Sequence, residues 1–219
     1  MKRKFQDGEG RLLGAPNKES LRLAPIGSEP PGTEAVLRTF VRIMDLKGLF
    51  RQGWLKRGVS EARAESVADH SFGTALLALL LADQLGQTEE FAGLDRLRCL
   101  EMALVHELGE VYAGDITPVD GVSPEEKYRR EREAFLRVVA GLPEADRLLA
   151  LWEDFEEGKS PESRFVRQLD RLEMGIQAAA LKAEGFSGMD EFLESAYRSV
   201  TQRDLKAILS LAEKSAWGV

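Results

Sequence analysis

The chain has 219 residues, of which 43% are apolar, and it carries a formal net charge of −7. This length and composition suffice for one substantial hydrophobic core. The acidic balance argues against a binder of polymeric nucleic acid, which needs basic side chains to neutralise phosphates, but one or two arginines suffice to hold a single nucleotide. The lone cysteine, Cys99, excludes an intrachain disulfide, and we expect it to be buried.

No long apolar segment is present. The most apolar run, residues 75–82, is far shorter than the roughly 20 residues that a membrane-spanning helix needs. The basic residues at the N-terminus are not followed by the apolar region of a secretory signal. We therefore expect no membrane association and a cytoplasmic location.

The composition changes near residue 32. Residues 1–32 are rich in Gly, Pro and charged side chains, which predicts a flexible N-terminal segment. From Thr33 onward helical patterns dominate, so we expect one domain over residues 33–219. Its first helix is predicted to be capped by Thr33 and to end at Gly48, before an irregular stretch over residues 49–65.

Two helices are predicted next, over residues 66–85 and 94–111. The centre of the first, residues 75–82, is apolar on all sides and predicts full burial. Residues 114–118 form a loop because Gly and Pro interrupt the helical pattern.

The C-terminal half is also predicted to be helical. Ser123 and Ser160 are each followed by Pro and Glu, which is typical of a helix start. Further helices are expected over residues 143–157, 160–184 and 189–216, and no stretch alternates like a strand, so the predicted fold class is all-α. The charged run over residues 125–133 is interpreted as a solvated helix face without a functional role.

The chain has two histidines, His70 and His106, each next to apolar helical sequence, and Asp170 lies beside the apolar stripe of the long helix. A buried polar group without a partner costs about 1–3 kcal/mol. A divalent metal is one such partner, since imidazole and carboxylate are common ligands. A hydrogen-bonded core histidine explains the same residues, and these residues alone leave both interpretations open.

Four strings occur in a fixed order: AESVADHS at residues 64–71, LVHELGE at 104–110, GDITP at 114–118 and FVRQLD at 165–170. Together with GLFRQGWLKRG at 48–58, this series resembles the HD-domain 5′-deoxynucleotidases and their HD-domain relatives. The resemblance covers about residues 36–185 and implies a single HD-domain helical bundle.

The resemblance also implies a role for particular residues. One divalent transition metal (Co, Mn, Zn, Fe or Ni) would be held by four ligands. Glu110 would be the catalytic carboxylate, one helical turn beyond the second histidine. Arg51 would hold the phosphate, Trp54 would wall the sugar and base, and Asp115 would lie at the sugar. The four implied metal ligands are His70, His106, Glu107 and Asp170.

The chain departs from the family pattern at two positions. The pattern has Arg directly before Trp54, where this chain has Gly53, so Arg51 is an approximate match and Arg57 competes for the phosphate role. The superfamily has His-Asp where this chain has His106-Glu107, and the Glu side chain is one methylene longer.

The same residues also have ordinary explanations. Glu110 and Asp115 fit solvated carboxylates at a helix end, Trp54 fits a loop anchor on the core, and Arg51 fits surface charge.

The favoured function is a metal-dependent hydrolase that converts deoxynucleoside 5′-monophosphates to deoxynucleoside and phosphate. Hydrolysis of another small phosphate ester is the first alternative. The second is a non-catalytic protein that binds a metal or small ligand. Because relatives of this family are commonly homodimers, we expect a homodimer formed through helix faces.

Overall fold

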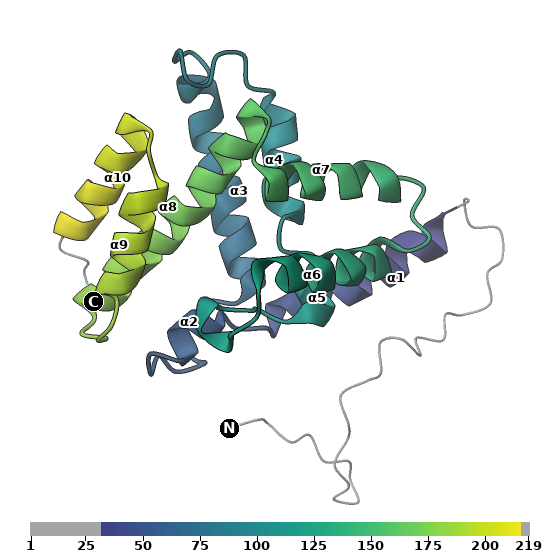
Figure 1. The fold of residues 1–219 in the computed structure, drawn as a ribbon, viewed down its shortest axis with the longest axis horizontal. Helices are drawn as coiled ribbons and strands as arrows, with labels where there is room; N and C mark the ends of the chain where they lie inside the picture. The colour runs from purple at the N-terminus through teal and green to yellow at the C-terminus, as the bar shows by residue number, and fades with distance from the viewer. Residues whose placement is uncertain (1–31, 216–219) are drawn as a thin grey trace, which may run out of the picture.

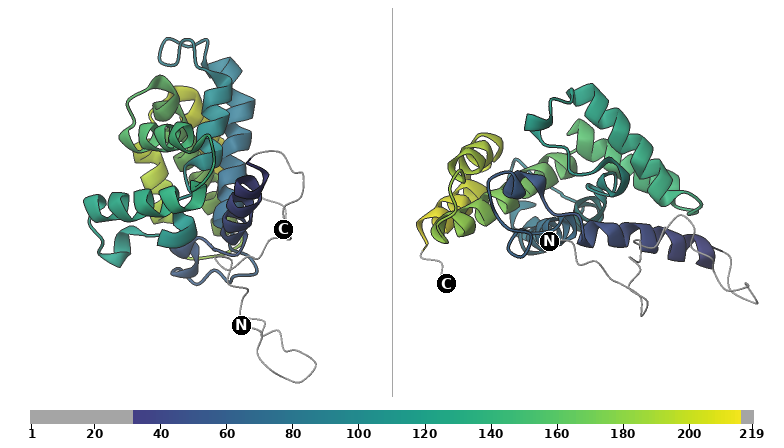
Figure 2. Two further views of the ribbon diagram at one scale, coloured as in Figure 1. Left: turned by 90° about the vertical axis from the view of Figure 1, so that its right-hand side faces the viewer. Right: turned by 90° about the horizontal axis from the view of Figure 1, so that it is seen from below.

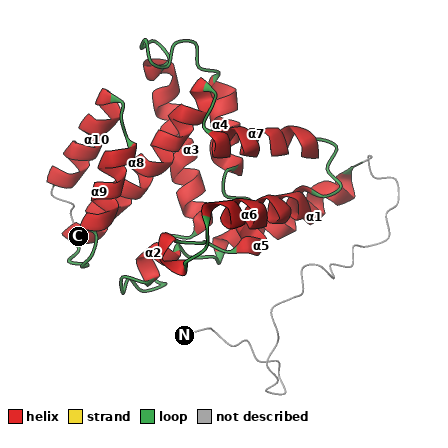
Figure 3. Ribbon diagram, in the orientation of Figure 1, coloured by secondary structure: helices red, strands yellow, loops and turns green. Residues whose placement is uncertain are grey.

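The computed structural model describes residues 32–215. The flexible segment expected over residues 1–32 thus lies, except for Gly32, outside the described residues. Within residues 32–215 every regular element is a helix, and the single β-bridge joins Phe50 and Ser66 (Figures 1 and 3). The all-α prediction is confirmed. The elements are α1 (Thr33–Ile43), the 3₁₀ helix η2 (Met44–Lys47), α2 (Gln52–Leu55), α3 (Val67–Leu85), α4 (Arg96–Val105), α5 (Glu110–Ala113), the 3₁₀ helix η3 (Pro118–Asp120), α6 (Pro124–Val139), α7 (Ala145–Glu157), α8 (Pro161–Ala183), α9 (Asp190–Ser199) and α10 (Arg203–Lys214).

Helix α8 organises the core. It packs against α3, α4, α7, α9 and α10, and α3 also packs along α4 (Figures 1 and 2). Phe165, Leu169 and Leu172 are fully buried at i, i+4 and i+7 of α8, so they form one apolar stripe. This packing brings α3, the end of α4 and the middle of α8 together, and these are the segments that carry the predicted metal ligands.

Helix α3 is buried on one face only, which corrects the expectation of full burial. Ala75, Ala78 and Ala82 lie in the core, whereas Phe72 is 62% exposed and Leu80 is 70% exposed. Small side chains let α3 approach α4 and α8 closely, and the larger apolar residues are left on the outer face. The apolar residues of α3 therefore belong to two surfaces, an inner face in the core and an outer face exposed to solvent.

The predicted helix starts are confirmed at three serines. Ser66, Ser123 and Ser160 each cap a helix by accepting a backbone hydrogen bond at the third helical position. The prediction of Thr33 as a cap is wrong, because α1 begins at Thr33 itself after Gly32, whose φ of 86° is left-handed. Asp69 completes a capping box with Ser66 and so fixes the first turn of α3.

The helix predicted over residues 94–111 is two helices in the structure. Helix α4 ends at Val105, a turn follows, and α5 begins at Glu110. In the turn, Leu108 N donates to Val105 O and Glu110 N donates to Glu107 O, at 3.1 and 3.0 Å. The break is close to α6, where a Cβ on Gly109 would lie 2.7 Å from the carbonyl oxygen of Glu131.

The sequence also predicts a buried cysteine and no membrane-spanning helix. Cys99 is fully buried in α4, as predicted. Among the helices of residues 32–215, none combines the length and apolar character needed to cross a membrane.

Candidate metal centre and its cavity

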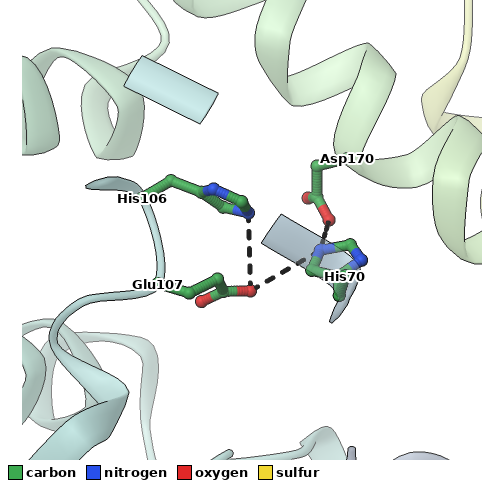
Figure 4. A group of neighbouring side chains, drawn as sticks. All are labelled: His70, His106, Glu107 and Asp170. Carbon is green, nitrogen blue, oxygen red and sulfur yellow. Dashed lines mark ion pairs between the residues drawn. The ribbon is translucent and has the colours of Figure 1, made fainter. Parts of the chain in front are cut away.

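The four predicted metal ligands meet at one point. His70 comes from the first turn of α3, His106 and Glu107 from the turn directly after α4, and Asp170 from the middle of α8 (Figure 4). One ligand atom from each residue lies within 4.8 Å of the others. The two imidazole rings are 5.5 Å apart between centroids, within the separation that two ligands of one ion can bridge.

Each imidazole is oriented by a bond on its far side. His70 Nδ1 lies 2.5 Å from Glu173 Oε2, and His106 Nδ1 lies 2.8 Å from the carbonyl oxygen of Ala103. Such partners fix the ring so that Nε2 faces the metal in known metal sites. The geometry of both histidines thus matches that of ligands supported by a second layer of hydrogen bonds.

Both Nε2 atoms are buried and, among the described residues, make no hydrogen bond. His70 Nε2 lies 3.1 Å from Asp170 Oδ1 without suitable geometry, and Glu107 Oε1 is 3.6 Å from His106 Nε2 and 3.8 Å from His70 Nε2. An unpaired buried polar atom is costly, and a divalent ion would satisfy both nitrogens together with the two carboxylates. The residues present therefore fit a metal.

The charges around the centre hold both ligand carboxylates ionised. Burial opposes ionisation of Glu107, but nearby positive charge, that of Arg51 included, outweighs it and lowers the pKa of Glu107 to about 2. Burial likewise opposes ionisation of Asp170, and Arg171 together with His70 holds its pKa well below its usual range. Burial lowers the pKa of His106, which favours the neutral imidazole that a metal requires.

Arg51 lies directly beside this centre. Its Nη1 is 3.2 Å from Glu107 Oε1 and 3.9 Å from Asp115 Oδ1. The β-bridge before α2 positions it, because Arg51 N donates to Glu65 O at 3.1 Å. Arg57, the competing arginine, instead pairs with Glu191 near the surface. Of the two candidates, only Arg51 reaches the side chains of the centre.

Trp54 packs on the core and also lines a cavity. It is 1% exposed, its Nε1 donates to Glu65 Oε1 at 2.8 Å, and its ring lies 4.4 Å from that of Phe192. Burial, followed by the charge of Glu173, raises the pKa of Glu65 to about 7. Trp54 is therefore packed on the core, as one sequence interpretation had it, while one side of it still lines the cavity described next.

Glu110 is the first residue of α5 and is 3% exposed, so it is not a solvated carboxylate. Its Oε2 makes no hydrogen bond to the described residues. Burial raises its pKa, and Glu107 and Asp115 add to the effect. Although α4 ends before it, the turn still places Glu110 beside the same cavity as Glu107.

A cavity of about 520 Å³, called the first cavity here, opens beside the candidate metal centre. Asp115 is at its polar end, where Oδ2 accepts from the backbone N of Gln52 at 2.5 Å. The first cavity has the size of a small-molecule site and combines charged groups at one end with an apolar wall. That wall includes Ile116, Pro118, Val122, Met174 and Phe192.

The expectation that residues 125–133 form only a solvated face is wrong. Glu131 is 4% exposed and Lys127, whose Nζ is 2.7 Å from Glu131 Oε1, lines the first cavity. Both share the helical face of the buried Ala134 and Phe135, so the 3.6-residue period carried a signal that the high charge obscured. Glu173 was also missed, although it lies one turn beyond Asp170.

Comparison with known proteins gives consistent matches. The family model described as HD domain matches residues 43–211. The chain is 39% identical over 150 residues to the 5′-deoxynucleotidase HDDC2 of Homo sapiens, covering 68% of this chain and 69% of that protein. It is 35% identical over 138 residues to the 5′-deoxynucleotidase hdd1 of Schizosaccharomyces pombe, covering 60% and 65%.

Solved structures show the same fold. The PH0347 protein of Pyrococcus horikoshii superposes with a TM-score of 0.69 at 32% identity, covering 81% of this chain and 98% of that one. A protein of Magnetospirillum magnetotacticum, described as a predicted metal-dependent phosphohydrolase, superposes with a TM-score of 0.63 at 26% identity, covering 82% and 88%.

Proposed function

Because the chain belongs to the HD-domain family, we propose that it is a metal-dependent 5′-deoxynucleotidase, which hydrolyses deoxynucleoside 5′-monophosphates to deoxynucleoside and inorganic phosphate. The observation that carries this proposal is the meeting of two histidines and two carboxylates beside Arg51, at the polar end of a nucleoside-sized cavity. The similarity to 5′-deoxynucleotidases supports it.

The proposed cofactor is one divalent transition metal, held by His70, His106, Glu107 and Asp170. Candidate ions are Co, Mn, Zn, Fe and Ni, since mixed imidazole and carboxylate ligands suit all of them. A bound ion would supply Lewis acidity at a phosphoryl oxygen. Glu107 fills the place of the usual aspartate, and its oxygen is already within 3.8 Å of both Nε2 atoms despite the longer side chain.

Arg51 is the proposed phosphate-binding residue. A guanidinium presents forked donors that match phosphoryl oxygens. Burial opposes its charge, yet Glu107 and Asp115 raise its pKa further above the ordinary value, so the side chain is a permanent cation beside the reaction centre. An arriving phosphate dianion would find this charge already in place.

Glu110 is the proposed proton donor to the leaving 5′-oxygen. Burial, Glu107 and Asp115 favour its neutral form, which carries the proton that an alkoxide leaving group requires. Asp115, at the polar end of the first cavity, is proposed to accept a hydrogen bond from the sugar. Trp54 and Phe192 form the aromatic wall against which the sugar and base would lie.

The test uses the purified full chain, loaded in turn with each candidate metal. Phosphate release is measured from deoxynucleoside monophosphates, ribonucleoside monophosphates and sugar phosphates, together with the metal content. Fastest release from deoxynucleoside monophosphates supports the proposal. Release from a sugar phosphate alone identifies another phosphohydrolase, and metal binding without any release identifies a non-catalytic protein.

We also propose that residues 33–219 form one domain, that the substrate is a single small nucleotide and not a nucleic-acid polymer, and that the chain is a homodimer.

The outer faces of α1 and α3 support the homodimer. Phe40 on α1 is 56% exposed, and Phe72 and Leu80 on α3 are 62% and 70% exposed. Exposed apolar surface of this kind is typical of an interface. Light scattering at micromolar concentration tests it, and a monomer mass rejects it. The cytoplasmic location stays a prediction.

A further inference from the structure

A second cavity, of about 650 Å³, adjoins the candidate metal centre. Glu107, Asp170, Lys127, Arg171 and Pro118 line both cavities. The first cavity alone includes Arg51 and Glu110, whereas the second alone includes His106. The ligand carboxylates therefore form a junction between two separate spaces, and both spaces give access to the centre.

The two cavities suit different molecules. The first cavity has the apolar and aromatic wall that a nucleoside needs. The second carries Arg164 and Arg167 in addition to the shared Lys127 and Arg171, with Phe155 and Pro118 as its main apolar residues. Serine and threonine hydroxyl groups complete its wall. Four cationic side chains with hydroxyl donors suit a small phosphate-like anion better than an apolar base. The hydroxyl residues are Ser195, Ser199 and Thr201.

Besides the predicted ligands Glu107 and Asp170, two further carboxylates line the second cavity, Glu90 and Glu156. Burial raises the pKa of Glu156, although Lys127 and Arg167 oppose that effect, so its negative charge is weakened. Glu90 accepts a long hydrogen bond from Gln168 Nε2, at 3.5 Å. A bound ion would balance the charge of Glu107 and Asp170, which leaves Glu90 and the weakened charge of Glu156 opposite the four cations.

The wall of the second cavity is built by fixed side chains. Arg167 Nη1 donates to the carbonyl oxygens of Phe155 and Glu156, at 2.9 and 3.0 Å. Gln168 Oε1 accepts from the backbone N of Thr201 and of Gln202, at 2.8 and 2.9 Å. These bonds hold α8, the end of α7 and the segment between α9 and α10 in one arrangement.

Lys127 lies at the junction and is also held in place. Its Nζ is 2.7 Å from Glu131 Oε1, one helical turn away, and Glu131 is buried against the turn that carries Gly109. Burial of the ammonium opposes its charge, but Glu131 raises the pKa of Lys127, so the lysine stays cationic. A positioned cation therefore faces both cavities.

The direction of the reaction connects these observations. In phosphoryl transfer the attacking and leaving oxygens are roughly in line. With the nucleoside in the first cavity, the 5′-oxygen leaves toward that cavity and water attacks from the other side of the phosphorus. The water oxygen bonds to phosphorus as the bond to the 5′-oxygen breaks; the water loses one proton and the 5′-oxygen gains one. The phosphate formed is displaced away from the nucleoside.

We propose that the second cavity receives this inorganic phosphate, contacted by Lys127, Arg167 and Arg171, so that phosphate and deoxynucleoside leave the centre by separate openings. This proposal rests on the proposed nucleotidase function, because phosphate is a product of that reaction. The binding of phosphate itself is measurable without turnover.

The experiment is calorimetry on the Mn²⁺-loaded full chain, with inorganic phosphate and with deoxyadenosine as separate probes. Ser199→Trp places a bulky ring in the second cavity, away from the predicted ligands. Arg198→Trp is the matched control, because residue 198 is exposed and does not line that cavity. Lys127→Met removes the junction cation by a different means, and thermal melting verifies that each variant is folded.

We expect Lys127→Met to weaken phosphate binding roughly ten-fold or more, the loss typical of a charge-assisted hydrogen bond. Ser199→Trp should weaken phosphate binding to a similar extent, because the indole ring would occupy the second cavity. Deoxyadenosine binding should change less than two-fold in Ser199→Trp. Arg198→Trp should change neither phosphate binding nor deoxyadenosine binding. In the unaltered chain, saturating deoxyadenosine should leave the affinity for phosphate unchanged. Unaltered phosphate binding in Ser199→Trp overturns the proposal, because Lys127 also lines the first cavity and Ser199 does not. If the unaltered chain hydrolyses no nucleotide but shows this binding pattern, the nucleotidase proposal fails and the anion site remains.

Discussion

His70 lies between two carboxylates of one helix. Asp170 Oδ1 is 3.1 Å from its Nε2 and Glu173 Oε2 is 2.5 Å from its Nδ1. Residues three apart share a helix face, so α8 presents both carboxylates to the same ring. The first is a candidate ligand of the metal and the second orients the ring toward it. This arrangement makes the metal centre depend on a residue that does not touch the ion.

Glu173→Ala should therefore weaken metal binding although Glu173 is not among the four proposed ligands. Loss of a partner that orients a ligand imidazole typically costs 10–100-fold in metal affinity. Titration of the metal-free chain with Mn²⁺ or Zn²⁺ measures the change, with the exposed Glu194→Ala as a control. Equal affinity in both variants would show that the Glu173 bond does not support the centre.

Glu107 carries the departure from the usual His-Asp pair. Glu107→Asp should keep a metal site, since it restores the His-Asp pair of the family pattern that the sequence resembles. Glu107→Ala removes a proposed ligand and its charge, and it should leave much less metal in the purified protein. Elemental analysis of the three proteins checks this, and full metal content in the alanine variant would remove Glu107 from the ligand set.

Arg51→Ala should raise KM for deoxynucleoside monophosphates by about 10–100-fold, because a charge-assisted phosphate contact is lost. Arg57→Ala is the matched control, since Arg57 pairs with Glu191 away from the centre. Steady-state kinetics of both variants decide the question. A higher KM in the Arg57 variant alone would transfer the phosphate role to that residue.

Glu110→Gln should lower kcat by about 10²–10⁴-fold, the usual range for general acid–base catalysis, with metal content unchanged. As a proton donor Glu110 is active when neutral, so kcat of the unaltered enzyme should fall as pH rises through its raised pKa. The variant should lack that fall. Full activity in Glu110→Gln would require a different proton donor.

Burial of Glu131 should make stability depend on pH. Burial raises its pKa to about 7, against the opposing effect of Lys127, whereas the unfolded chain has the ordinary value of 4.5. The folded state therefore binds the proton more tightly, and its contribution to stability is present below about pH 4.5 and is lost as pH rises to about 7. A shift of this size corresponds to roughly 3 kcal/mol.

Glu131→Gln should reduce this dependence. Its free energy of unfolding, measured with urea, should fall less between pH 4.5 and 7 than that of the unaltered chain. Glu133→Gln on the exposed face of α6 is the control. Identical pH profiles for the two variants would contradict a buried, titrating Glu131.

Local sequence determined the helical class and most helix starts. Ser123 and Ser160 cap the helices that they were expected to start, and Ser66 caps the helix predicted from residue 66, because a cap depends on a few neighbouring backbone groups. The ordered motifs around His70 and His106 identified the family, and the HD-domain match confirms that identification. Neither result needed long-range contacts.

Tertiary structure decided the environment of each side chain. The break after Val105, the exposed outer face of α3 and the burial of Glu131 all depend on which helix packs against which. The bridge between Phe50 and Ser66 holds Arg51 beside the candidate metal centre, whereas Arg57 pairs with Glu191 near the surface. Hydrophobic period and capping describe one helix at a time, whereas burial and charge depend on groups distant in sequence, so only the folded chain placed Glu173 and Lys127 beside the metal centre.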